Sequence, residues 1–389
     1  MQHSQKGGVT RRAFSAGALF GTLAAPSIAR AQGGHMTVNS HAEAVLEGLR
    51  EEFPIPALSA AVVKDGDLVW SEARGSADLE NGVPASPQHI FRMGSVAKVV
   101  TAAIGARLLD QGVIDLDAAI STYRPDLPLA HRATTLRQLY NHQGGVRHYT
   151  PNDLNPLSPT GSIDTKIFLS TDEALGIFIN DDLIAEPGTR VSYSTFGYTL
   201  ISAVLESASG ASFTDLIKQE VSGPLELETL GHEDPFDIVS NRVGFYDPPG
   251  MYLRLIPQLL LPNIPAINAF PTTPTYKYAG GGMNGTAGDV ARFGAAQMAG
   301  DFISEEARAT LFTPRAQMSP QTGLGLGWRI DRHDMLGKRY HHAGNMQGCR
   351  AQLALYPEHG LSVALMSNMG ATPGPILNYT DRIAAAFIA

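Results

Sequence analysis

The sequence predicts an α+β fold, an α/β sandwich whose antiparallel sheet is built from strands at both ends of the chain. Strand patterns cluster near the N-terminus and again toward the C-terminus, helical patterns occupy the middle, and no segment repeats. The simplest packing joins the two end groups into one sheet flanked by helices, with a central all-helical insert. We expect a functional site in the cleft between the sheet and the insert.

The first elements are a helix and a strand hairpin. Residues 39–52 carry apolar side chains at helical spacing. The runs 57–63 and 68–73 alternate as strands do, and Asp65-Gly66 between them is a strong hairpin signal.

The middle of the chain is predicted to be helical. Residues 95–111 are apolar nearly all round, which indicates a buried helix, and Gly112 follows at its C-terminal end. Thr286 is a candidate N-cap. The other predicted helices cover residues 135–141, 196–207, 213–221 and 286–298. Residues 150–166 and 243–278 are predicted to be long functional loops.

The C-terminal part returns to strands and ends in a helix over 381–388. The predicted strands cover residues 324–330, 340–343, 347–356 and 361–366. Residues 357–360 form a turn signal between the last two strands. Together these elements predict a sheet domain over 32–389, with a helical subdomain over about 95–320 inserted into it.

Composition excludes several classes of protein. The chain has 389 residues, of which 43% are hydrophobic, so it has enough apolar surface to form a core. This length suits one large domain or two closely packed ones. The net charge of −8 argues against a nucleic acid as partner. The single cysteine, Cys349, cannot form an intrachain disulfide and is interpreted as a small buried filler.

Residues 1–31 are predicted to be an export signal. Arg11 and Arg12 precede a mildly apolar run over 13–28, and Ala29-Arg30-Ala31 has the small-x-small pattern of a cleavage site. The paired arginines favour the twin-arginine route. A membrane anchor is the alternative, but the run is short and weakly apolar. Cleavage would remove four basic residues and no acid, changing the net charge from −8 to −12. This prediction places the mature chain in the periplasm or outside the cell.

No segment of the mature chain is predicted to span a membrane. The longest apolar stretch, residues 251–271, is interrupted by four prolines. Its part over 251–270 has two open interpretations: it covers the site, or it fills a groove between the two halves of the domain.

Ser95-Val-Ala-Lys98 is the first candidate for chemistry. A serine at a helix N-terminus gains from the positive end of the helix dipole. Lys98 lies one turn later on the same face, within reach of the hydroxyl. Lysine is out of place in an apolar helix, and burial lowers the pKa of its amine, so that it becomes a base near neutral pH.

Two further motifs follow along the chain. Tyr193-Ser-Thr195 lies in a turn before a helix, where a phenol beside a cation relays a proton to a leaving group. A tyrosine that only packs at the helix start is the alternative. His342-Ala-Gly344 lies on a short strand, where a backbone N–H serves as an oxyanion donor opposite that of Ser95. His341 and His342 point to opposite faces of that strand, which argues against a shared zinc ion.

The three motifs occur in the order and approximate spacing of the serine β-lactamase and penicillin-binding-protein superfamily, which the chain therefore resembles. The pattern is most like the class C β-lactamase-like branch, and within it the mitochondrial serine β-lactamase-like proteins and their bacterial relatives. The segments that carry the resemblance are Phe91–Ser95, Leu139–Tyr149, Tyr193–Leu200 and Ala279–Met283.

The resemblance implies a serine hydrolase that forms an acyl-enzyme on Ser95 and needs no metal or organic cofactor, and the N-terminal signal predicts that it is exported. Lys98 and Tyr193 would activate Ser95, either one being the base, and His342 completes the candidate catalytic set. Substrate and oxyanion contacts are expected from Thr195, Gly344, Asn345 and His148. For the segment around His148, a purely structural role in hydrogen bonding is the alternative.

Departures from the family pattern concern the substrate. The second motif usually ends in Asn, but Thr195 offers only a hydroxyl. The third motif usually begins with Lys in efficient β-lactamases, whereas His342 would be mostly neutral at about pH 7.5. Weak β-lactamase activity at best is therefore expected, on a small-molecule or peptide substrate. Peptide, amide and ester substrates stay open, as do a non-catalytic scaffold, a penicillin-binding sensor and the oligomeric state.

Overall fold

The computed structural model describes residues 33–155, 161–250, 264–370 and 376–388. The predicted export signal lies outside the described residues, as does most of the apolar stretch that begins at Met251. Of the helices that the structure describes, none is both long and apolar enough to cross a membrane.

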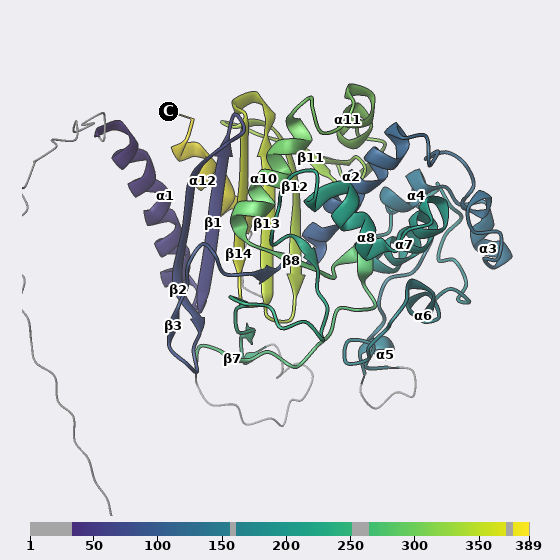
Figure 1. Ribbon diagram of the computed structural model, residues 1–389, viewed down its shortest axis with the longest axis horizontal. Coiled ribbons are helices and arrows are strands. Elements are labelled where there is room, and N and C mark those ends of the chain that lie inside the picture. Colours follow the sequence, from purple (N-terminus) through teal and green to yellow (C-terminus); the bar gives the residue numbers. More distant parts are fainter. Residues whose placement is uncertain (1–32, 156–160, 251–263, 371–375, 389) are drawn as a thin grey trace, which may run out of the picture.

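Nine strands form one antiparallel sheet in the order β3-β2-β1-β14-β13-β12-β11-β10-β9 (Figure 1). Its N-terminal strands are β1 (Ala57–Lys64), β2 (Asp67–Asp78) and β3 (Val83–Pro84). Its C-terminal strands are β9 (Ala316–Ser319), β10 (Thr322–Leu324), β11 (Arg329–His333), β12 (Gly337–Met346), β13 (Cys349–Tyr356) and β14 (Leu361–Ser367). β1 pairs with β14, with Ala61 opposite Ala364, so the two ends of the chain meet in the sheet. The predicted fold class is confirmed.

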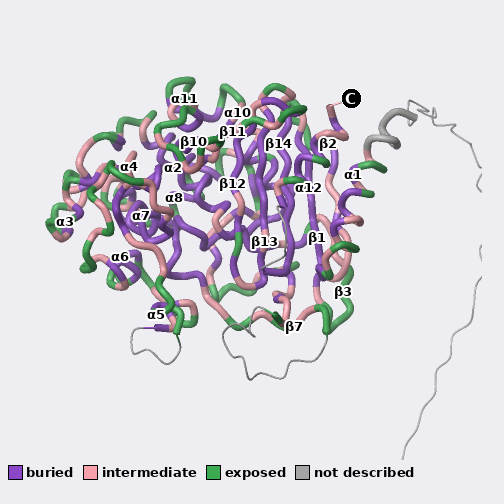
Figure 2. Tube along the Cα trace, turned by 180° about the vertical axis from the view of Figure 1, so that it is seen from behind, coloured by how far each residue is buried: buried purple, intermediate pink, exposed green. Residues whose placement is uncertain are grey.

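Both faces of the sheet are buried, as the purple central strands in Figure 2 show. The β1–β2 hairpin turns at Asp65 and Gly66, whose φ angles of 51° and 93° suit a tight hairpin. Because side chains alternate along a strand, β1 contributes to two cores. The larger core contains Ala57, Ala61 and Val63, and the other contains Leu58, Ala60 and Val62.

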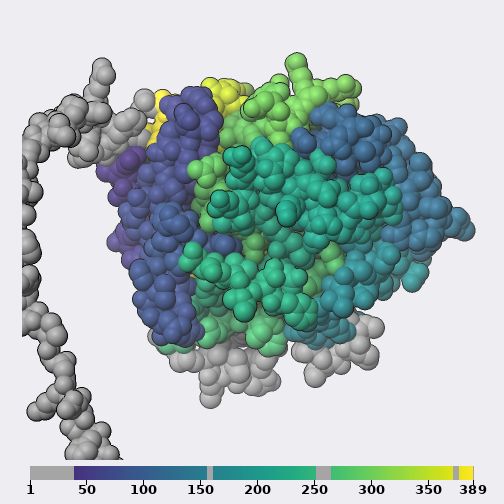
Figure 3. Space-filling view, viewed as in Figure 1, coloured from purple at the N-terminus to yellow at the C-terminus, as the bar shows by residue number. Residues whose placement is uncertain are grey.

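Helices cover the sheet on both faces. α1 (Gly33–Glu52) and α12 (Ile376–Ala386) pack together over one face, and these segments from opposite ends of the sequence share one edge of the surface in Figure 3. α10 (Ala287–Met298) packs against β1 and β14. Its N-cap is Thr286, whose side chain accepts from the backbone N–H of Asp289, as predicted. α10 therefore contacts the sheet, although it lies within the sequence range predicted for the insert.

The remaining middle segment is mostly helical. Its helices are α2 (Ala97–Asp110), α3 (Leu129–Arg132), α4 (Leu136–Tyr140), α5 (Pro151–Leu154), α6 (Thr171–Leu175), α7 (Thr195–Ser209), α8 (Phe213–Ile217) and α11 (Glu305–Phe312). Short strands interrupt it: β4 (Phe91–Arg92), β5 (Gly231–His232) and β8 (Met283–Gly285) form one small sheet, and β6 (Tyr246–Asp247) pairs with β7 (Ile267–Asn268). Strands of two or three residues are too short to show a hydrophobic period.

The predicted strand over 324–330 is wrong in one respect. β10 ends at Leu324 and β11 begins at Arg329, because a turn separates them. Gly325 N–H donates to the carbonyl of Trp328, and Gly327 adopts a φ of 71°, which favours glycine. A Cβ at Gly327 would lie 2.9 Å from the carbonyl oxygen of Lys98, so this turn packs directly on α2.

Candidate active site

Ser95 lies where a short 3-10 helix (Gly94–Val96) leads into α2. Gly94 has a φ of 50°, and a Cβ there would lie 2.9 Å from the backbone nitrogen of Asn345 on β12. Glycine at this position therefore permits the close approach of the serine turn to the sheet edge. Ser95 is partly exposed, whereas Lys98, one turn later, is fully buried.

The Lys98 amine contacts three oxygen atoms. Its Nζ lies 3.2 Å from Ser95 Oγ, 3.3 Å from Thr195 Oγ1 and 2.5 Å from the carbonyl oxygen of Gly280. Burial, and then the charge of Arg329, lower the pKa of Lys98 well below its usual value. A neutral amine has two N–H groups and one lone pair. A protonated amine donates to all three oxygens, whereas a neutral amine that donates to Gly280 and Thr195 has its lone pair left for the Ser95 hydroxyl.

Tyr193 reaches the same hydroxyl from the other side. Its Oη donates to Ser95 Oγ over 2.8 Å. Ser194 fixes this turn as the N-cap of α7, accepting from Gly197 N–H and donating to the carbonyl of Arg147. Burial raises the pKa of Tyr193, although its bond to Ser95 and the charge of Arg329 offset part of the rise. The phenol is therefore protonated at neutral pH and can donate a proton.

His148 has two roles: its ring binds the backbone at the start of α7, and it lines the cavity. Its Nδ1 accepts from the backbone N–H of Thr195 over 3.2 Å, so the ring proton of the neutral form is on Nε2. Burial, followed by the charges of Lys98 and Lys277, lowers the pKa of His148 to about 4. The neighbouring Arg147 instead forms ion pairs with Asp153 and Asp181, which is a structural role.

The third motif places the backbone of β12 against the serine turn. A Cβ at Gly344 would lie 1.9 Å from the carbonyl oxygen of Met93 and 3.2 Å from Ser95 N. Ala343, Gly344 and Asn345 line the cavity, but His342 does not. His342 is buried, its ring centroid lies 6.5 Å from that of Tyr193, and its Nδ1–H donates to the carbonyl of Ala343 over 2.8 Å.

His342 carries no charge in this environment. Burial, then repulsion by Arg329 and Lys98, lowers its pKa well below the usual value. His341 takes a different partner, Asp331, whose carboxylate lies 3.1 Å from its Nε2. In the described part of the chain, no three His, Cys, Asp or Glu side chains are grouped so that they could hold a metal ion.

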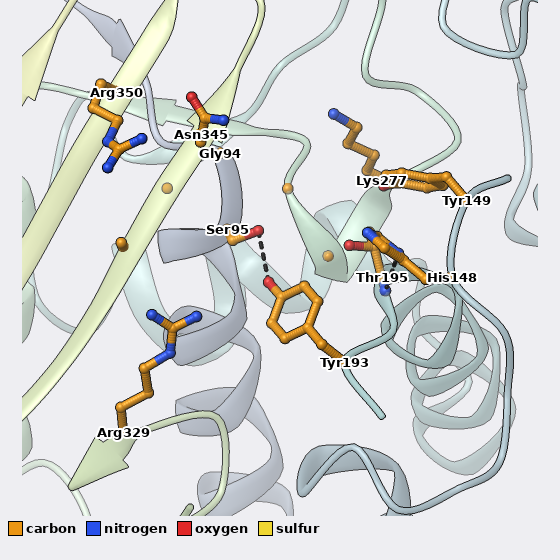
Figure 4. A pocket seen from close by; sticks show the side chains of 14 residues that line it. Gly94, Ser95, His148, Tyr149, Tyr193, Thr195, Lys277, Arg329, Asn345 and Arg350 are labelled. Carbon is orange, nitrogen blue, oxygen red and sulfur yellow. Dashed lines mark hydrogen bonds between the residues drawn. The ribbon is translucent and has the colours of Figure 1, made fainter. Parts of the chain in front are cut away.

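The cavity above Ser95 has a volume of about 270 Å³ and is lined by three cations that the sequence analysis missed. Arg329 on β11 and Arg350 on β13 lie on the sheet side of Ser95, and Lys277 lies across from them (Figure 4). No pattern in the sequence links these residues to the motifs, since single cations between apolar residues are usually solvent-facing.

Arg329 is placed by the Gly325–Trp328 turn that packs on α2. Its Nε is buried and has no hydrogen-bond partner, and no acidic side chain of the described residues forms an ion pair with its guanidinium. Arg329 is half-buried and only its Nε is cut off from solvent, so the rest of the guanidinium is free to meet an anion in the cavity. Planar and bidentate, it suits a carboxylate.

Residues 42–386 match the family model described as Beta-lactamase. The mitochondrial serine beta-lactamase-like protein LACTB of Homo sapiens is 26% identical over 401 residues, which cover 81% of this chain and 71% of that protein. In its mouse counterpart the matching region is 56% of the protein, so this chain spans little more than half of that relative.

A bacterial relative and a solved structure are also similar. The D-alanyl-D-alanine-carboxypeptidase/endopeptidase AmpH of Escherichia coli K12 is 27% identical, over 69% of this chain and 68% of that protein. The crystal structure of D-amino acid amidase from Ochrobactrum anthropi SV3 superposes with a TM-score of 0.77 at 21% identity, covering 90% of this chain and 98% of that one. At that identity, the likeness shows the fold.

Proposed function

Because the chain belongs to the beta-lactamase family, whose members are serine hydrolases, we propose that it is a D-peptidase that forms an acyl-enzyme on Ser95. Its preferred substrate is a peptide whose leaving D-residue carries a free carboxylate. The observation that carries this choice is the unpaired guanidinium of Arg329 at the cavity wall. The printed name of the AmpH relative, a D-alanyl-D-alanine-carboxypeptidase/endopeptidase, supports the same substrate class.

The first chemical step is acylation. Ser95 Oγ attacks the scissile carbonyl while its proton passes to the neutral amine of Lys98, 3.2 Å away. Backbone N–H groups of Ser95 and Asn345 stabilise the oxyanion. Tyr193 protonates the leaving nitrogen, and the proton held by Lys98 replaces the one that Tyr193 gives up. Water then attacks the acyl ester and gives its proton to the neutral amine of Lys98, and Lys98 returns a proton to Ser95 Oγ as the ester C–O bond breaks and the acid product leaves.

The same features argue for poor turnover of β-lactams. His342, where efficient β-lactamases usually have lysine, is buried and neutral, and Thr195 offers a hydroxyl that already contacts Lys98. The cation that meets a substrate carboxylate is then Arg329, on a neighbouring strand. A cephalosporin is therefore expected to be a much slower substrate than a D-Ala-D-Ala peptide.

The test compares an N-acyl-D-Ala-D-Ala peptide with its C-terminal amide. Arg329→Met should lower kcat/KM for the acid by about 10–100-fold, because a hydrogen bond to a charged group contributes about 1.5–3 kcal/mol. Turnover of the amide should change much less. Arg332→Met, an exposed position on the same strand, is the matched control. Equal losses on the acid and the amide would contradict the role of Arg329.

The same assay, run with a p-nitrophenyl ester, a chromogenic cephalosporin and a Ser95→Ala control, separates the rival functions. Turnover that disappears in Ser95→Ala supports the hydrolase. A long-lived acyl adduct on the parent, seen by intact mass without turnover, would favour a penicillin-binding sensor instead. Absence of both adduct and turnover would favour a scaffold.

We also propose that the chain is exported through its twin-arginine signal and acts in the periplasm or outside the cell. Expressed from its first residue in a bacterial host, it should yield a periplasmic product whose mass begins after Ala31. Replacing Arg11 and Arg12 by Lys should keep the protein in the cytoplasm, because the route reads the arginine pair. Equal export of the double variant, measured by fractionation, would contradict the twin-arginine route.

A further inference from the structure

Lys277 is a second buried lysine at the cavity, on the side opposite Arg329. It precedes the short 3-10 helix Tyr278–Gly280, whose last carbonyl accepts from Lys98. Only 9% of Lys277 is exposed, and its stem packs against Gly281, where a Cβ would lie 3.1 Å from Lys277 Cδ. Figure 4 shows its side chain across Ser95 from Arg329 and Arg350. The amine therefore meets whatever occupies that half of the cavity.

No protein group satisfies this amine. It forms neither a hydrogen bond nor an ion pair with any residue the structure describes, and its close contacts are the ring faces of Tyr276 and Tyr149, 5.5 and 6.0 Å from their centroids. Burial, then repulsion by Arg92 and Lys98, lowers the pKa of Lys277 to about 8. It is thus still largely protonated at neutral pH.

The nearby acids are already engaged or too remote to pair. Glu233 accepts three hydrogen bonds from Arg92, at 2.7, 2.8 and 3.0 Å, in a buried ion pair. Asp164 accepts from Gln347 and forms no ion pair with Lys277. The amine therefore opens on the cavity, where it has no counter-charge from the described residues, and an anion that enters the cavity would supply one.

We propose that Lys277 forms an anion subsite for the acyl half of the substrate, so that the enzyme prefers peptides whose residue at the attacked carbonyl carries a side-chain carboxylate. This inference rests on the proposed function, because the Arg329 side then holds the leaving residue and the Lys277 side faces the acyl residue. The chemical class is an acidic acyl donor, such as a D-glutamyl-D-alanine peptide. A neutral acyl residue leaves the ammonium unpaired.

The experiment measures binding rather than turnover. N-acetyl-D-Glu-D-Ala and N-acetyl-D-Gln-D-Ala share the C-terminal carboxylate and differ only in the acyl side chain. Calorimetry on the Ser95→Ala protein should give a dissociation constant about 10-fold lower for the Glu peptide, as expected for one charge-assisted contact. Adding Lys277→Met should bring the ratio of the two constants close to one, and Lys277→Arg, which keeps the charge, should restore it.

A matched Arg329→Met variant distinguishes the two cations. It should weaken binding of both peptides alike and leave their ratio unchanged. Equal binding of the two peptides by Ser95→Ala, or a Glu preference that survives Lys277→Met, would overturn the subsite. If the parent cleaves neither peptide but the binding preference depends on Lys277, the proposed peptidase function fails and the subsite stands.

Discussion

Replacing Lys98 by methionine should lower kcat/KM for a p-nitrophenyl ester by about 10²–10⁴-fold, the range expected for loss of a positioned general base. Methionine keeps the length and the apolar stem of lysine but has no lone pair aligned with Ser95 Oγ. The ester also has a good leaving group, which needs little help from Tyr193, so the loss reports on activation of Ser95. Initial rates and the rate of acyl adduct formation by intact mass measure the effect.

The pH dependence of the rate tests whether Lys98 is the general base. Because burial and Arg329 lower the pKa of Lys98, the amine is neutral above that lowered pKa and protonated below it. The parent rate should therefore fall as the pH falls through the lowered pKa, since the protonated amine has no lone pair. Lys98→Met should lack this acid limb.

A matched control is Lys64→Met. Lys64 lies at the end of β1, where its Nζ donates to the carbonyl of Phe387 over 2.8 Å, so both its rate and its pH profile should match the parent. If Lys98→Met kept the acid limb, another group would be the base, and the Tyr193 phenol would be the first to test by Tyr193→Phe.

Contacts that are local in sequence were predictable. Ser95 and Lys98 are one helical turn apart, so the 3.2 Å contact between them follows from helix geometry alone. The same holds for the hairpin at Asp65-Gly66 and for the N-cap at Thr286. The pairing of β1 with β14 is not local, but it follows once both ends of the chain carry buried strands and the middle does not.

Contacts that depend on three-dimensional packing were not predictable from one sequence. Arg329 enters the site because the turn before it packs on α2, and Lys277 because Gly281 leaves room for its stem. Neither feature produces a hydrophobic period or a motif. For His342 the spacing indicated a place near the site, but whether a side chain on that strand faces the cavity or the core depends on the register of β12.

The second large effect is expected at Gly344, where the backbone of β12 touches the serine turn. Alanine there would place its Cβ 1.9 Å from the carbonyl oxygen of Met93, far inside the contact distance, so β12 and the turn must move apart. Both proposed oxyanion donors, Ser95 N–H and Asn345 N–H, lie on the two segments that separate. Gly344→Ala should therefore reduce kcat by about 10²–10³-fold, as loss of an oxyanion-hole donor does.

The free energy of unfolding should fall as well, since crowding a packed interior costs about 1–3 kcal/mol. A lower urea midpoint of unfolding would report this change. Gly231→Ala on β5 is the matched control, because a Cβ there meets no atom within 4 Å. It makes the same chemical change in a strand, and should leave both the rate and the urea midpoint close to those of the parent.

Full activity of Gly344→Ala would mean that the strand accommodates the methyl group without displacing Asn345, and the oxyanion hole would then have to be sought elsewhere. Reduced stability with an unchanged kcat would lead to the same conclusion, because it would separate the packing of β12 from the position of the donor.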